Sequence, residues 1–179
     1  MLRAETFEVS DNTPGLQQFI DDMVETMRGA SGVGLAAPQV GRCERLFVAD
    51  LSPVADGIVA ERPESLSQPL VFINPEILEE GEEETEFEEG CLSIPDLYET
   101  VVRADHLRMK YLDGQFEPQI IEVRGKAAGV LQHEYDHLEG ILFIDYLSSF
   151  GRSLLKRRLR NVSLGIVEAD YPLRVASSV

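Results

Sequence analysis

The sequence predicts one domain, spanning residues 1–179, of mixed helices and strands, and three observations support this fold class. Apolar residues recur at helical spacing in two segments, 13–29 and 125–139. Between them lie several runs that are apolar or alternate between apolar and polar residues, as strands do. A length of 179 residues suits one domain with a sizeable core, and no repeat or linker divides it.

Charge and composition narrow the classes of function. A formal net charge of −16 argues against binding to DNA or to anionic membrane surfaces. Nine glutamates between positions 76 and 89 contribute to it and are typical of a solvated face. The sequence holds no apolar run of membrane-spanning length and no secretory signal, so a cytoplasmic location is expected. Cys43 and Cys91 are too few for a disulfide framework.

The N-terminal part predicts an extended arm and one amphipathic helix. Residues 1–12 are the arm, and Thr13 and Pro14 are a helix-starting pair, a capping hydroxyl followed by a proline. The helix ends near Gly29 and presents an apolar stripe formed by Leu16, Phe19, Ile20, Met23, Val24 and Met27. After a segment rich in glycine and alanine, residues 45–50 predict a buried strand, and residues 52–68 an exposed loop.

The middle of the chain predicts strands. Residues 70–75 form an apolar strand that we expect Pro75 to stop, and the following glutamates suit an exposed strand. Further strands are expected at 98–102, 106–112 and 115–123, the last two joined by a tight hairpin at Asp113-Gly114. His106 lies in an alternating segment, so we expect it to face solvent and not to bind a metal.

The C-terminal part predicts two helices. The first begins at Gly125 and ends at Gly140, and an apolar segment follows at 141–144. The second spans 151–161 with Ser148 or Ser149 as its cap, and residues 162–179 are expected to form a loosely ordered tail. The second helix carries a basic cluster of Arg152, Lys156, Arg157, Arg158 and Arg160.

The first of these helices contains His133-Glu134-Tyr135-Asp136-His137, which predicts a hydrolytic metal site. Two histidines four apart project from one helix face, and the glutamate between them stands beside a metal-bound water. Such a site needs a third protein ligand. One metalloprotease pattern requires a histidine where Phe143 stands, and Glu168 is a weaker candidate in the tail. Cys91 is the better supported third ligand.

Three segments together resemble the signature motifs of peptide deformylase, in the order found in that family. They are 32–39 (GVGLAAPQ), 89–93 (EGCLS) and 132–137 (QHEYDH). The resemblance implies an α+β fold, with antiparallel strands packed around a central helix that carries the HExxH motif. It also implies removal of the formyl group from the N-terminal formylmethionine of newly synthesised polypeptides, with release of formate.

The resemblance further implies roles for individual residues, which chemical arguments support. Cys91, His133 and His137 would hold a metal, with Glu134 as the general base. The amide of Gln39 and the backbone N–H of Leu92 would stabilise the oxyanion. An apolar pocket would take the methionine side chain, and the substrate backbone would lie as an added strand beside Val33, Gly34 and Gly90.

The metal expected from the family is ferrous iron, one per chain, although ligand types alone favour zinc. Zinc or nickel would then be alternative occupants of a purified sample. As a further expectation, the basic C-terminal helix docks transiently on the ribosome.

The sequence departs from the family pattern at three places. Tyr98 stands where many members carry an arginine that orients the substrate, so Tyr98 is expected to contact the peptide and alter preference. Gly129 occupies a helix position where arginine is frequent. Leu2-Arg3-Ala4 resembles the end of an initial segment that in relatives begins earlier, so a further strand is expected before it.

Two other functions fit part of the pattern. A metallopeptidase would use the same glutamate and histidines to cleave an internal peptide bond. A catalytically silent metal-binding protein would keep the metal and act through the basic helix as a docking partner. Release of formate from a formylated peptide separates deformylation from both.

Overall fold

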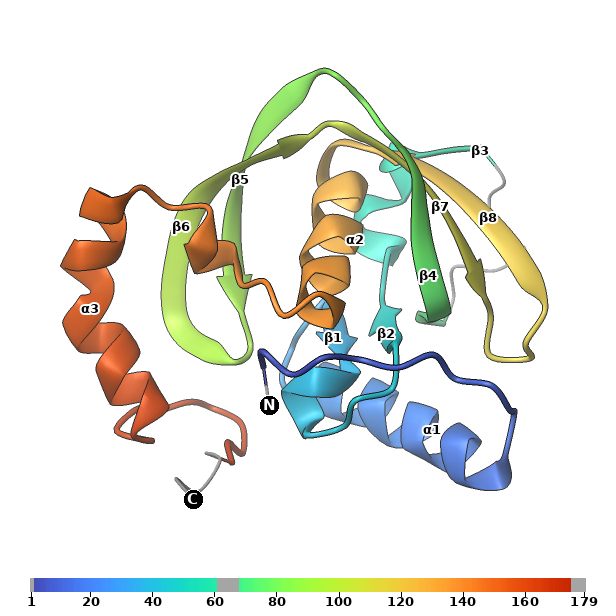
Figure 1. Cartoon of the computed structure of the whole chain (residues 1–179), viewed down its shortest axis with the longest axis horizontal. Helices are drawn as coiled ribbons and strands as arrows, with labels where there is room; N and C mark the ends of the chain where they lie inside the picture. Colours follow the sequence, from blue (N-terminus) through green and yellow to red (C-terminus); the bar gives the residue numbers. More distant parts are fainter. Residues whose placement is uncertain (1, 61–67, 175–179) are drawn as a thin grey trace.

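The structure is a computed structural model, and it describes residues 2–60 and 68–174. Two antiparallel sheets enclose a central helix (Figure 1). Strands of the larger sheet follow the order β1-β2-β4-β7-β8-β3, and β5 pairs with β6 in the smaller one. The helices are α1 (Pro14–Gly29), α2 (Gly125–Leu138) and α3 (Ser149–Ser163), with 3-10 turns η1 (Ala37–Val40), η2 (Ser52–Gly57) and η3 (Phe143–Asp145). The strands are β1 (Gly34–Ala36), β2 (Leu46–Ala49), β3 (Ile58–Ala60), β4 (Leu70–Glu80), β5 (Glu84–Cys91), β6 (Ile94–Ala104), β7 (His106–Leu112) and β8 (Pro118–Arg124).

Helix α2 is the element around which the two sheets close. Ten of its 14 residues are buried, and its apolar side chains share one core with strands of the larger sheet. Small residues on α2 allow close packing: a Cβ on Gly129 would lie 3.3 Å from the ring of Phe87 on β5. The helix ends at Leu138 with Glu139 as its C-cap, and Gly140 follows with a φ of +69° as the terminating glycine that the sequence predicted.

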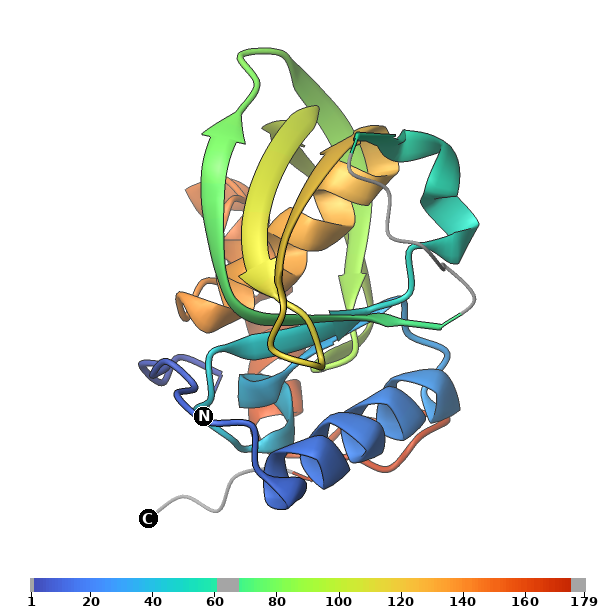
Figure 2. The same cartoon turned by 90° about the vertical axis from the view of Figure 1, so that its right-hand side faces the viewer.

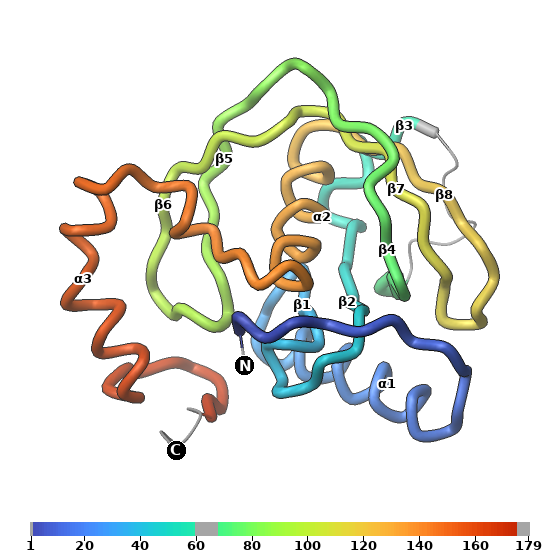
Figure 3. The backbone as a smooth tube through the Cα atoms, viewed as in Figure 1, coloured from blue at the N-terminus to red at the C-terminus, as the bar shows by residue number. Residues whose placement is uncertain are grey.

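Helix α1 packs beneath β1 and β2 (Figure 2) and forms a separate part of the core. Thr13 caps it by accepting a hydrogen bond from the backbone N–H of Leu16, which confirms the predicted start. The N-terminal arm is extended and crosses below the end of α2 (Figure 3). Arg3 ties the arm there through hydrogen bonds to the carbonyl of Gly140 and the carboxylate of Asp145.

The structure corrects three predictions about strands and loops. The loop expected at 52–68 includes η2 and the edge strand β3, whose Ile58 is buried against β8; residues 61–67 lie outside the described residues. Pro75 does not stop β4. The register between β4 and β7 shifts between Ile73 and Glu76, so Pro75 lies where the ladder does not need a backbone N–H.

The hairpin after β7 is also longer than predicted. Its loop spans residues 113–117, because the carboxylate of Asp113 accepts the N–H groups of Gln115 and Glu117 and closes a wider turn. His106 pairs with Glu122 across β7 and β8 and is half-buried, not exposed as expected. In the described ranges, no helix is long and apolar enough to cross a membrane.

Helix α3 begins at Ser149, with Ser148 as its cap, and runs to Ser163. It is two residues longer at each end than the predicted helix 151–161. Its Leu155 and Leu159 pack against the apolar cluster formed by β5, β6 and η3, whereas Leu154 is exposed. The last part of the predicted tail, 175–179, lies outside the described residues, whereas Tyr171 forms a hydrogen bond with the body of the protein.

Candidate metal centre

The end of β5 meets α2 at three potential metal ligands. The sulfur of Cys91 and one ring nitrogen each from His133 and His137 lie within 4.8 Å of one another, and all three residues are buried. The Sγ of Cys91 is 3.3 Å from Nε2 of His137, close to the ~3.5 Å expected between two ligands of one tetrahedral ion. Thiolate and imidazole together suit a transition-metal cation. The donor set therefore fits a bound metal.

The electrostatics of the cluster favour the thiolate form of Cys91. Burial opposes the charge of the thiolate, but the neighbouring imidazoles of His137 and His133 outweigh it and lower the pKa of Cys91 to about 5. Burial likewise opposes a charged His133, yet contacts with Cys91 and Glu89 raise its pKa to about 10. The site thus stabilises a negative sulfur beside positive charge, which is what a metal cation would supply.

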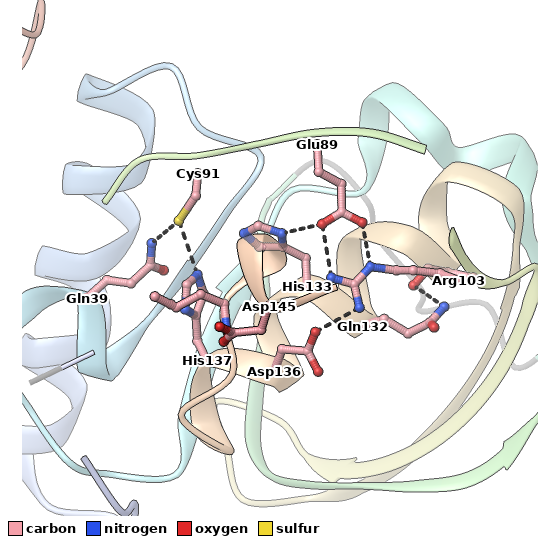
Figure 4. A network of polar contacts seen from close by, with 11 residues as sticks. Gln39, Glu89, Cys91, Arg103, Gln132, His133, Asp136, His137 and Asp145 are labelled. Carbon is pink, nitrogen blue, oxygen red and sulfur yellow. Dashed lines mark hydrogen bonds and ion pairs between the residues drawn. The ribbon is translucent and has the colours of Figure 1, made fainter. Parts of the chain in front are cut away.

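A buried ionic network stands behind His133 (Figure 4). The Nδ1 of His133 lies 2.9 Å from Oε2 of Glu89, and a carboxylate oxygen can only accept, so Nδ1 carries the proton. Arg103 on β6 donates to both oxygens of Glu89 and, over 2.8 Å, to Asp136. Burial raises the pKa of Glu89, but His133 and Arg103 outweigh burial and hold that pKa below its ordinary value. The network turns Nε2 of His133 toward the other ligands.

Glu134 lies beside the three ligands and is almost fully buried. Burial raises the pKa of its carboxyl group to about 7, despite the nearby histidines. Its Oε2 has no hydrogen-bond partner among the described residues. Gly34 on β1 faces it, and a Cβ there would overlap the carboxylate. The absence of a side chain at position 34 therefore leaves room for this glutamate.

Gln39 reaches the same centre from η1. Its Oε1 accepts the backbone N–H of Ala36 at 2.7 Å, which leaves the amide nitrogen pointing to the cluster. That nitrogen lies 3.5 Å from the sulfur of Cys91 (Figure 4). It also lies 3.2 Å from Oγ of Ser93. The N–H groups of this amide are thus directed at the three potential metal ligands.

A cavity of about 540 Å³ opens next to Glu134 and His133. It lies between two strand edges, since β1 ends the larger sheet and β5 pairs only with β6 among the described strands. Val33 and Tyr98 line its mouth and are exposed, and Phe87, Gly129 and Val130 line an apolar part. Gly90 also lies in its wall, with the ring of Tyr98 against it.

The structure brings together every residue that the sequence singled out for this site and adds others. His106 and Glu168 are not in the cluster found among the described residues. Sequence reasoning missed Glu89 as a partner of His133, because it stands in a run of glutamates interpreted as solvated. Its position directly before Gly90-Cys91 was the available signal. Arg103 and Phe87 gave no signal, since both look like ordinary strand residues.

Comparisons with known proteins agree on one family. A family model described as polypeptide deformylase matches residues 1–153. The chain is 60% identical to a peptide deformylase of Salinibacter ruber, over 96% of this chain and 88% of the relative. It is 44% identical to one of Christiangramia forsetii, over 97% of this chain and 90% of the relative. A crystal structure of a peptide deformylase from Legionella pneumophila is similar with a TM-score of 0.79 and 40% identity, covering 93% of this chain and 92% of that one.

Proposed function

This chain belongs to the peptide deformylase family, and we propose that it works with one metal ion held by Cys91, His133 and His137. Family membership confirms the resemblance seen in the three sequence motifs. The protein is a hydrolase that removes the formyl group from nascent polypeptides whose N-terminal residue is formylmethionine. The observation that carries the metal proposal is the meeting of three donor atoms within 4.8 Å in a buried site.

We propose ferrous iron as the native ion, with zinc or nickel as occupants of purified protein. The sulfur and two nitrogens support any of these three cations. When bound, the cation lowers the pKa of a water molecule and polarises the formyl oxygen.

Glu134 is the proposed general base. Its free Oε2 is available to accept a proton from the attacking water and to return it to the leaving amine. Burial raises the pKa of this carboxyl group, which makes its carboxylate a stronger base for the first step.

Gln39 and Leu92 are the proposed oxyanion donors. The amide nitrogen of Gln39 is already oriented by the Ala36 N–H, so little reorganisation is needed when charge develops on the formyl oxygen. The backbone N–H of Leu92 directly follows the ligand Cys91 and would approach the same oxygen from the other side.

The substrate would bind as an added strand between the edges of β1 and β5. Val33 and Gly34 lie on one side and Gly90 on the other, and backbone pairing there reads a peptide without regard to its side chains. The methionine side chain would enter the apolar part of the cavity near Phe87. The exposed ring of Tyr98 would contact the residues that follow methionine.

We also propose that residues 1–179 act as one catalytic domain in the cytoplasm, where nascent chains are made. Its basic helix α3 would dock transiently on the ribosome, with no role for DNA or membrane. Arg152, Lys156 and Arg160 are exposed and support this. Replacing these three with glutamine should weaken cosedimentation with ribosomes, whereas Lys110→Gln on β7 should not. Equal ribosome affinity of both variants would refute docking through α3.

The decisive test is release of formate from formyl-Met-Ala by protein loaded anaerobically with ferrous iron. We expect turnover of this substrate and none of acetyl-Met-Ala, because a methyl group in place of the formyl hydrogen makes the carbonyl carbon less electrophilic and hinders attack on it. Cleavage of an unformylated peptide at an internal bond would instead indicate a metallopeptidase. Full metal occupancy without formate release would overturn the proposed mechanism.

A further inference from the structure

The C-terminal segment returns to the turn that follows β5. Tyr171 lies beyond α3, and its hydroxyl donates a hydrogen bond of 3.0 Å to the backbone carbonyl of Leu92. Leu92 directly follows the ligand Cys91. Burial raises the pKa of Tyr171, so the phenol stays protonated and remains a donor at neutral pH. A residue 79 positions away in the sequence therefore contacts the turn at the metal centre.

A second polar contact and an apolar one join the same two parts of the chain. Arg158 on α3 donates to the carbonyl of Pro95, at 3.4 Å, and to that of Asp96. Asp96 has a φ of +55°, a left-handed conformation that its neighbours must maintain. Leu155 and Leu159 pack against the apolar cluster that includes Cys91. Figure 1 shows α3 lying along the outer side of β6.

The turn held in this way bears one proposed oxyanion donor and contacts the other. The N–H of Leu92 is one proposed donor, and Oγ of Ser93 lies 3.2 Å from the amide nitrogen of Gln39, the other donor. The side chain of Leu92 packs against Gly32, where a Cβ would overlap it. The Leu92–Ser93 peptide joins the residue that bears the first donor to the residue whose hydroxyl contacts the second, and the bond from Tyr171 to the Leu92 carbonyl fixes this peptide. A displacement of the peptide would therefore shift the residues next to both donors.

We propose that Tyr171 is a positioning residue for deformylation, which holds the turn of Cys91, Leu92 and Ser93 in the orientation that the two oxyanion donors need. This inference rests on the proposed roles of Leu92 and Gln39. The family model ends at residue 153, so Tyr171 lies outside the part of the chain that it matches. Turnover then depends on a segment beyond the catalytic motifs.

Tyr171→Phe tests this, with Glu168→Gln as a control at an exposed position of the same segment. The variant keeps the ring and removes only the donor hydroxyl. We expect kcat to fall about fivefold, the range of one lost hydrogen bond, while KM, metal content and Tm stay at the wild-type values. In the zinc-loaded protein, the amide NMR signal of Ser93 should shift, since its peptide loses a hydrogen bond at the Leu92 carbonyl. Glu168→Gln should change neither kcat nor the Ser93 amide signal.

Three results would overturn the inference: an unchanged kcat, an unchanged Ser93 signal, or a loss of kcat that follows loss of metal or of folding. The last would show a role in stability alone. Formate release by the wild-type protein is measured first, so an inactive wild type identifies a failure of the proposed function separately. A shifted Ser93 signal would then still support the contact between Tyr171 and the turn.

Discussion

Glu89→Gln tests how the metal centre is held in place. The change keeps the shape of the side chain and removes its negative charge. The glutamine oxygen can still accept from Nδ1 of His133, which now lies 2.9 Å from the carboxylate. Arg103 keeps Asp136 at 2.8 Å, so its buried guanidinium is not left without an anion. The change removes the negative charge that strengthens two buried hydrogen bonds, those of Glu89 with His133 and with Arg103.

The size of the effect follows from these contacts. Removing one partner of a buried ion pair costs about 3–5 kcal/mol when the other is left alone. Since Asp136 remains beside Arg103 and an amide oxygen replaces the carboxylate, we expect a smaller loss of unfolding free energy, about 2–3 kcal/mol. For a chain of this length, that corresponds to a fall in Tm of about 8 °C.

Metal affinity gives the second measurement. Without an anionic acceptor on Nδ1, His133 is less firmly oriented, and we expect binding of zinc to weaken about 10- to 100-fold in competition with a chelator. Glu84→Gln, on the same strand but exposed, is the matched control for the change in charge. If the Glu89→Gln and Glu84→Gln variants have the same Tm and the same metal affinity, the buried ionic network behind His133 does not support the metal centre.

Three further predictions concern the centre itself. Cys91→Ala should abolish metal binding, whereas Cys43→Ala at the other free cysteine should retain it, as measured by metal content after dialysis. Glu134→Gln should keep the metal and lower kcat by about 10²-fold or more; wild-type turnover would exclude Glu134 as the base. Gly34→Ala should lower kcat/KM by about 10²-fold, because its Cβ overlaps Glu134, while Gly29→Ala, with nothing within 4 Å, should not change kcat/KM.

The parts of the site that could be predicted from sequence are those fixed by local geometry. Spacing of four on a helix puts His133 and His137 on one face whatever the rest of the fold does. The caps of α1 and α3 were equally predictable, because a Ser or Thr hydroxyl satisfies a backbone N–H three residues later.

The parts that could not be predicted depend on pairing between distant segments. Arg103 becomes a partner of Glu89 only because β6 pairs with β5 and both lie against α2. Pro75 remains within β4 only because the register shifts there, which no local rule reveals. The contact of Tyr171 with Leu92 requires α3 to lie along β6 first.

The division of the proposed ligands between α2 and β5 explains why so much of the chain supports this site. Two histidines on one buried helix are held rigidly relative to each other, but Cys91 belongs to a hairpin outside the larger sheet. That hairpin is fixed by its apolar cluster with η3 and α3, where Phe143 also stacks on His133. The distance between sulfur and imidazoles is therefore set by packing in the C-terminal third of the chain. Weakening that packing should affect the metal centre before it affects the larger sheet.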